Sequence, residues 1–232
     1  ASCAYLLRNK KYAIFIHVIA ALTLLILAVG LETHVIPGFH NLSVLNHVLI
    51  SAAGAPFTLY LNFDKTVVGI FILGLLHPLL ATRSQWIDMF KATLPRACVV
   101  IIIVACVAFA LKFVHFDPKF PHSFFIWALT NLLFVCLAEE ALFRGFIQKY
   151  LCVVLQRFPW GNVVAIIIAS ILFGLAHHAG GIRYMVLATV AGLGYGWIYF
   201  RTKRMEASII THFSLNLVHF LLFTYPALAS AL

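Results

Sequence analysis

The chain has 232 residues, of which 63% are hydrophobic and only 10% are charged, and its mean hydropathy is +1.03. This composition excludes an ordinary soluble domain and predicts a polytopic helical membrane protein. The formal net charge is +9, but the basic residues are separated by apolar runs and form no continuous stripe. Such spacing fits orientation signals and lipid headgroup contacts. We therefore expect membrane lipids, and no nucleic acid, among the partners.

Seven apolar runs reach the length of about 20 residues that a helix needs to cross a bilayer. They are residues 12–31, 66–82, 97–114, 123–146, 162–178, 183–200 and 206–229. An eighth, weaker run at 43–63 contains polar residues, glycine and proline, so a full span, a kinked span and a re-entrant piece all remain open. If it does not cross, most Lys and Arg residues lie on one side, as the positive-inside rule requires. We expect an all-α bundle of seven to eight transmembrane helices, and the charges favour seven.

The first run follows Arg8, Lys10 and Lys11, a basic start like that of a signal peptide. No clear small-residue cleavage site follows, so residues 12–31 are predicted to remain as the first helix. The charge distribution then places the amino terminus in the cytoplasm, and the compact length suggests a bacterial inner membrane. No repeat, linker or low-complexity stretch divides residues 1–232, which are expected to form a single domain.

Three sequence features limit the choices further along the chain. The segment 82–96 mixes apolar and charged residues, which predicts an interfacial amphipathic helix, with a solvated loop as the alternative. Ala188, Gly192 and Gly196 recur every four residues, a spacing that allows helices to pack closely in lipid. The cysteines are odd in number and show no CxxC spacing, so neither a disulfide framework nor a zinc ribbon is indicated: Cys3, Cys98, Cys106, Cys136 and Cys152.

Two adjacent carboxylates lie within the run 123–146. Glu139 and Glu140 are two of only seven acidic residues, and a charge at mid-bilayer costs about 2.5–3.5 kcal/mol, so it is normally kept for a function. Glu140 and Arg144 are four residues apart on one helix face, which favours a structural ion pair. Glu139 points about 100° away around the helix and has no such partner. We therefore predict that Glu139 belongs to a catalytic site.

Histidines interrupt two later apolar runs. His177 ends the run from 162, and His212 shares a helix face with Asn216 early in the last run. If the helices on either side of 158–161 are antiparallel, Glu139 and His177 lie at nearly the same depth, about 27 Å from that turn. His212 fits less well, because it would reach His177 only through tilted spans or an inward-dipping connection.

In this order, Glu139-Glu140-xxx-Arg144, Phe173-xxx-His177 and His212-xxx-Asn216 resemble the three motifs of the CAAX protease and bacteriocin-processing family of intramembrane endopeptidases. That family includes the Ras-converting CAAX prenyl endopeptidases. The motifs cover residues 139–216, about a third of the chain. The resemblance implies eight membrane helices, a catalytic core at about 123–229, and a protein or peptide substrate that is membrane-anchored or lipidated.

The resemblance also implies roles for these residues. Glu139 would be the general base and would hold a water together with His177. His212 and Asn216 would stabilise the oxyanion, and Glu140 and Arg144 would be the supporting pair. Such chemistry requires an intramembrane polar cavity that water can reach, and it needs no metal or cofactor.

Two other functions remain open from the sequence. A zinc-dependent protease would use Glu139, His177 and His212 as three ligands with a water as the fourth, although no HExxH helix is present. A non-enzymatic proton-coupled transporter or scaffold would use the same charges as an ion path. Five further residues in the apolar runs receive no catalytic role, and structural hydrogen bonding is expected for the histidines among them: His17, His47, His77, His219 and Asn131.

Overall fold

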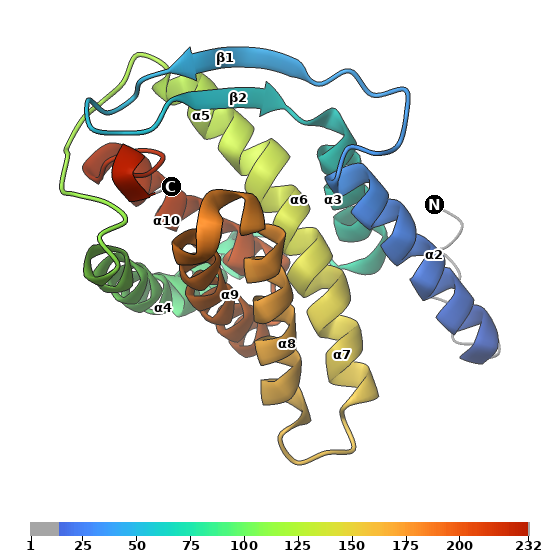
Figure 1. The fold of residues 1–232 in the computed structure, drawn as a ribbon. Coiled ribbons are helices and arrows are strands. Elements are labelled where there is room, and N and C mark those ends of the chain that lie inside the picture. The colour runs from blue at the N-terminus through green and yellow to red at the C-terminus, as the bar shows by residue number, and fades with distance from the viewer. Residues whose placement is uncertain (1–13, 232) are drawn as a thin grey trace.

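The structure is a computed structural model that describes residues 14–231, so the predictions for Arg8, Lys10 and Lys11 lie outside the described residues. A helical bundle is covered at one end by a two-stranded hairpin (Figure 1). The single helices are α2 (Ile14–Glu32), α3 (Phe63–Leu76), α4 (Arg83–Ala110), α8 (Gly161–Ala176), α9 (Gly181–Thr202) and α10 (Met205–Leu222). A continuous helical run consists of α5 (Phe124–Thr130), η1 (Asn131–Cys136), α6 (Leu137–Glu140), η2 (Ala141–Gln148) and α7 (Lys149–Val154). Two short 3₁₀ turns are η3 (His178–Gly180) and η4 (Ala229–Ala231).

The prediction of a helical membrane bundle is confirmed, since each of the seven predicted runs contains a helix. Within residues 14–231, four helices are long and apolar enough to cross a membrane, namely α2, α4, the run 124–154 and α10. The pair formed by α8 and residues 178–202, bent by 59°, gives a fifth if it counts as one span. Helix α3 is shorter than predicted because Pro78 forces an extended backbone at His77, where the helix ends.

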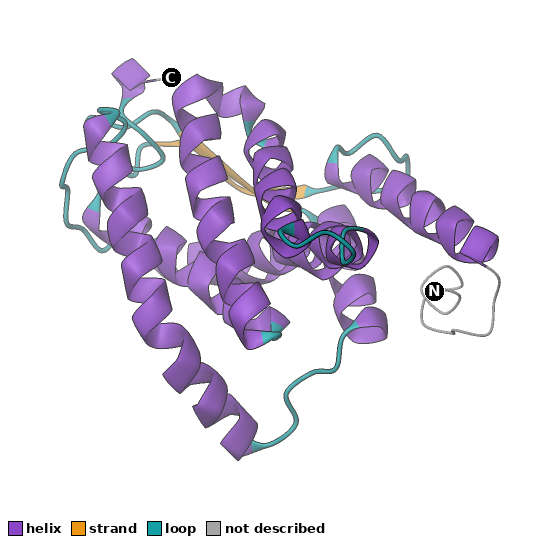
Figure 2. Ribbon diagram, turned by 90° about the horizontal axis from the view of Figure 1, so that it is seen from below, coloured by secondary structure: helices purple, strands orange, loops and turns teal. Residues whose placement is uncertain are grey.

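Helix α2 lies at the periphery of the bundle (Figures 1 and 2). It packs on α3 and leaves large apolar side chains exposed, including Phe15 and Ile26. An apolar surface of this kind is stable against lipid and unfavourable in water. The packing therefore supports an integral membrane protein.

The segment 82–96 is not a separate interfacial helix, because it forms the first half of the continuous helix α4. A capping box between Thr82 and Gln85 begins the helix. Pro95 lies inside it without ending it, and the Arg96 guanidinium donates a hydrogen bond to the nearby Ala92 carbonyl. The charged residues that suggested an interfacial segment are the exposed first turns of a longer span.

The weaker run at 43–63 forms an antiparallel hairpin of β1 (Leu42–Val48) and β2 (Phe57–Leu61) instead of a membrane helix. Apolar and polar side chains alternate from Phe57 to Leu61, which is the two-residue period of a strand. Gly54 lies in the turn, where an added Cβ would be 2.5 Å from the Tyr225 carbonyl oxygen. The run does not cross as a helix, in agreement with the charge distribution.

Two π-helical segments, η1 and η2, flank the short helix α6 that carries both glutamates. Side chains four residues apart drift by about 40° around an α-helix, whereas the wider π turn drifts the other way. The alternation of π-helical and α-helical turns keeps Asn131, Val135 and Glu139 on the same wall of a cavity. The π-helical segments therefore allow residues from successive helical turns to line the same cavity.

Helix α9 approaches η2 closely at its glycines, as the small-residue spacing predicted. Arg144 Nη2 donates to the Gly192 carbonyl oxygen at 3.0 Å, and Gln148 Nε2 donates to the Gly196 carbonyl oxygen at 3.0 Å. A Cβ at Gly196 would lie 2.7 Å from Gln148 Oε1. These contacts fix the first motif against α9.

Candidate active site

The Glu140 carboxylate is fully buried and joins two helices. Oε1 accepts hydrogen bonds from Arg144 Nη1 and His212 Nδ1, both at 3.0 Å, and Oε2 accepts one from the Ser208 hydroxyl. The side chains of Glu140 and Arg144 are both 0% exposed. Charge-assisted hydrogen bonds of this kind offset the cost of burying an ion pair. Glu140 therefore holds α10 against the helix that carries the glutamates.

Arg144 extends the same network toward the second motif. Its guanidinium carbon lies 4.5 Å from the centre of the Phe173 ring and 5.2 Å from that of Tyr195. A guanidinium over an aromatic face is stabilised electrostatically. The Arg144 side chain therefore packs against Phe173, whose backbone carbonyl in turn orients His177.

Glu139 has different surroundings although it is the next residue. Its side chain is 13% exposed, and Oε2 has no hydrogen-bond partner within the described residues. Oε2 lies 3.9 Å from His177 Nε2, which is too long for a direct hydrogen bond. Glu139 also lines a cavity of about 410 Å³. It is therefore the carboxylate with unused hydrogen-bonding capacity beside the cavity.

His177 lies at the carboxyl end of α8, where its ring is fixed by local contacts. Nδ1 lies 2.7 Å from the Phe173 carbonyl oxygen, so Nδ1 carries the proton that is donated. The ring also packs against Phe173 and Tyr184. In the neutral imidazole, Nε2 then holds a lone pair on the side of Glu139.

His212 reaches the site because the start of α10 is inside the protein. Met205, Ala207 and Ser208 are at most 2% exposed, so the connection from α9 leads directly into the bundle. The His212 ring stacks on Tyr195 with a centroid distance of 4.6 Å. Since Nδ1 contacts the Glu140 carboxylate, Nε2 is the ring nitrogen that remains for a ligand.

Asn216 is held by two residues to which the sequence assigned no role. Its Nδ2 donates to Asn131 Oδ1 at 3.1 Å and contacts Cys136 Sγ at 3.7 Å. Cys136 Sγ also donates to Asn131 Oδ1 at 3.3 Å. A polar residue inside the apolar run 123–146 was the signal for Asn131, but its contact with Asn216 depends on how the helices pack.

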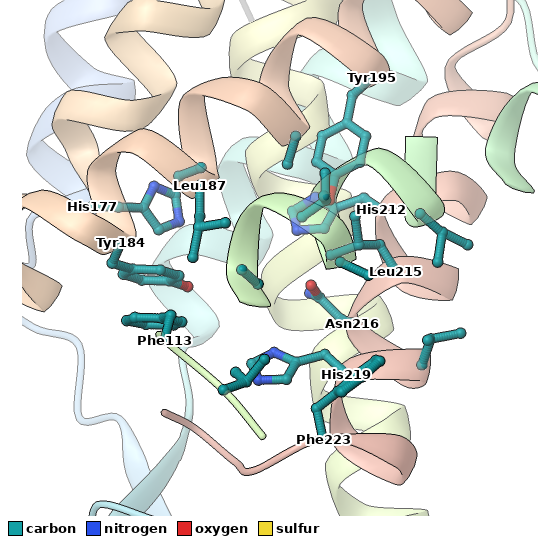
Figure 3. Close-up of a pocket in the computed structure, with 18 of the residues that line it drawn as sticks. Phe113, His177, Tyr184, Leu187, Tyr195, His212, Leu215, Asn216, His219 and Phe223 are labelled. Atoms are coloured by element: carbon teal, nitrogen blue, oxygen red, sulfur yellow. The ribbon is translucent and has the colours of Figure 1, made fainter. Parts of the chain in front are cut away.

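Two cavities meet at the predicted site residues. The larger, of about 410 Å³, lies beneath β2, and a smaller apolar one of about 100 Å³ lies between α4, α9 and α10. Figure 3 shows the smaller cavity, with His212, Asn216 and His219 on α10 opposite His177, Tyr184 and Phe113. These same six side chains also line the larger cavity. Tyr184 and Phe113 come from segments that sequence reasoning did not connect to the site.

Other candidate residues lie elsewhere or have structural partners. His178 is exposed, and its Nδ1 contacts the Leu175 carbonyl oxygen. His77 Nε2 donates to the Gly145 carbonyl oxygen at 2.8 Å, and His219 Nε2 donates to that of Thr224 at 3.2 Å. For the zinc alternative, no group of three His, Cys, Asp or Glu side chains between residues 14 and 231 is arranged to hold a metal ion. Glu139, His177 and His212 line one cavity but do not form such a group among the described residues.

The family comparison gives one match. Residues 121–218 match the family model described as type II CAAX prenyl endopeptidase Rce1-like. Searches of curated proteins and of solved structures found no match. The matched segment contains all three motifs and the buried Glu140 network. Residues 121–218 of this integral membrane protein are therefore similar to the Rce1-like type II CAAX prenyl endopeptidases, which supports the resemblance to the CAAX protease and bacteriocin-processing family.

Proposed function

We propose that the protein is an intramembrane endopeptidase in which Glu139 and His177 activate a water to cut a peptide bond of a membrane-anchored or lipidated protein. The observation that carries the proposal is the pair formed by Glu139 Oε2 and His177 Nε2. The two atoms are 3.9 Å apart, and Oε2 has no partner among the described residues. A family match to CAAX prenyl endopeptidases supports the choice of reaction.

The first step is proton removal from the water. Hydrogen bonds of about 2.8 Å from one water can reach both atoms of this pair. Glu139 accepts a proton as the water oxygen attacks the carbonyl carbon, and His177 Nε2 accepts the second hydrogen bond and orients the attack. The Phe173 carbonyl supports this role because it keeps the His177 proton on Nδ1.

The second step stabilises the negative charge on the carbonyl oxygen. His212 Nε2 donates a hydrogen bond only when the ring carries protons on both nitrogens, because Nδ1 already donates to Glu140. Preorganised donors at such a position contribute about 10²–10³ in rate each.

Asn216 is the second proposed donor, and the amide pair with Asn131 controls it. In the structure Asn216 Nδ2 donates to Asn131 Oδ1. If both amides exchange their nitrogen and oxygen positions, Asn131 donates to Asn216 and the Asn216 nitrogen turns to the cavity. Glu139 finally returns its proton to the amine nitrogen as the carbon–nitrogen bond breaks.

The substrate and the membrane setting belong to the proposal as well. The cavity lies within a bundle whose outer side chains are apolar, which suits a substrate that is itself held at the membrane. We further propose the bacterial inner membrane, with the amino terminus in the cytoplasm, from the distribution of Lys and Arg.

The test uses the purified protein in liposomes and a fluorescent peptide that ends in farnesylated Cys-aliphatic-aliphatic-X. Wild-type protein and Asp88→Asn, a control at an exposed carboxylate on α4, are expected to cut the peptide, whereas Glu139→Gln is not. In parallel, membranes with wild type and with Glu139→Ala are compared by proteomics for a protein that stays uncut. Full activity of Glu139→Gln would remove the proposed base, and pH-dependent transport without cleavage would favour the transporter alternative.

A further inference from the structure

The outer edge of strand β2 is an unpaired strand edge on the wall of the larger cavity. β1 pairs with one edge of β2. Among the described residues, no backbone group of 57–61 forms a hydrogen bond to any other segment. A strand edge with free N–H and C=O groups is a template for another extended chain.

The lining of the cavity shows that this edge faces inward. Four consecutive residues of β2, 57–60, line it together with Glu139 and His177. Successive side chains of a strand point to opposite faces, so one face alone would contribute alternate residues. A consecutive set indicates that backbone atoms of β2, and not only the side chains of one face, border the cavity. Figure 1 agrees, since β2 is the strand nearer to the helices.

The hairpin is held in place by the carboxyl-terminal segment. Ala55 N donates to the Ala227 carbonyl oxygen at 3.0 Å, and Ala229 N donates to that of Ala53 at 3.1 Å. Tyr225 N donates to Ser51 Oγ at 2.9 Å, and a hydrogen bond from Ser51 lowers the pKa of Asp117. Leu59 packs in the cluster around Trp127, Phe220 and Tyr225. A fixed edge can align a peptide without first being ordered.

We propose that the substrate binds as an extended peptide that adds a third strand to the outer edge of β2, which brings its scissile carbonyl to Glu139 and His177. The proposal rests on the proposed function, because the occupant is the peptide that is cut. Main-chain hydrogen bonds to β2 provide affinity, and they leave the side chains of the peptide to alternate between the cavity and the helices. The hairpin is thereby a substrate-binding element and more than a cover.

The test replaces backbone amides of the farnesylated peptide by esters, one residue at a time along the part that precedes the cysteine. An ester lacks the N–H donor and keeps the side chain. Since only one edge of the peptide pairs with β2, KM is expected to rise about 5- to 10-fold at every second residue, with little change between them. A flat profile, or an effect limited to the residue beside the cut bond, would overturn the proposal.

A second measurement locates the bound peptide directly. The peptide carries a benzophenone, and the Glu139→Gln protein keeps it uncut during photocrosslinking. Adducts on residues 57–61 are expected, whereas adducts confined to the α4 residues of the smaller cavity, Ile101, Val104, Ala105 and Ala108, would contradict strand pairing. If wild type failed to cut the unmodified peptide, that result would count against both the proposed function and this inference. If wild type cut the peptide but the ester profile were flat, that result would count against this inference alone.

Discussion

Glu139 and Glu140 are neighbours in the chain but have opposite surroundings. Glu140 accepts hydrogen bonds from Arg144, Ser208 and His212 and is completely buried. Glu139 has one oxygen without a partner and borders a cavity. A carboxylate that is fully satisfied holds a structure together, whereas one that is not can exchange a proton with a ligand. Their environments therefore suit these two identical side chains to different tasks.

The largest effect is expected when the Glu139 carboxylate is neutralised. Glu139→Gln keeps the size of the side chain and removes the base, so kcat should fall by about 10²–10⁴-fold. Because Oε2 has no partner to lose, the midpoint of thermal unfolding in detergent should not change. A large drop in that midpoint would show that Glu139 is structural, like its neighbour.

The same change one residue later should act on stability. Glu140→Gln leaves Arg144 buried without a counter-charge, which typically costs about 3–5 kcal/mol of unfolding free energy. Denaturant unfolding measures the loss, and the double variant Glu140→Gln/Arg144→Met should recover much of it without recovering activity. Recovery of activity in the double variant would mean that the network does not position His212.

His212 contacts Glu140 and also lines the cavity that Glu139 borders. Its replacement should therefore separate an effect on catalysis from an effect on substrate binding. His212→Phe keeps an aromatic ring to stack on Tyr195 but removes the proposed oxyanion donor. The expected result is a decrease in kcat of about 10²–10³-fold, with KM nearly unchanged. A rise in KM at constant kcat would instead indicate a role in substrate binding.

The smallest effect is expected at Asn131, which acts through Asn216. Asn131→Ala removes the hydrogen bonds from Asn216 and Cys136 and should lower kcat about 10-fold or less. A double-mutant cycle with Asn216→Ala should be non-additive, because the double variant loses no more than Asn216→Ala alone. Additive losses would show that Asn131 acts independently of Asn216.

The sequence predicted much of the bundle, and the residues that it proposed for the site, Glu139, His177, His212 and Asn216, line one cavity. Apolar length alone located the helical runs, and the i, i+4 spacing paired Glu140 with Arg144, which the structure joins at 3.0 Å. The depth argument brought Glu139 near His177 because both positions depend only on helix rise and one turn. Apolar runs, i, i+4 pairs and depths measured from one turn all depend on residues that are close in sequence or separated by a single turn.

What could not be predicted depends on long-range packing. The hairpin at 42–61 was ambiguous because the alternation from Phe57 to Leu61 covers only five residues, which is too short to separate a strand from a helix by period alone. The contact of His212 with Glu140 requires the buried start of α10, and that of Asn131 with Asn216 requires π turns. Neither the buried connection nor a π turn has a reliable signal in a single sequence.

The proposed mechanism depends on a water that Glu139 and His177 activate, and oxygen labelling tests this most directly. In a single turnover in H₂¹⁸O, the new carboxyl terminus of the product should carry ¹⁸O, and the Glu139 carboxylate should contain none. Incorporation of ¹⁸O into Glu139, with an unlabelled product, would show direct attack by the carboxylate and would contradict the role of Glu139 as a base.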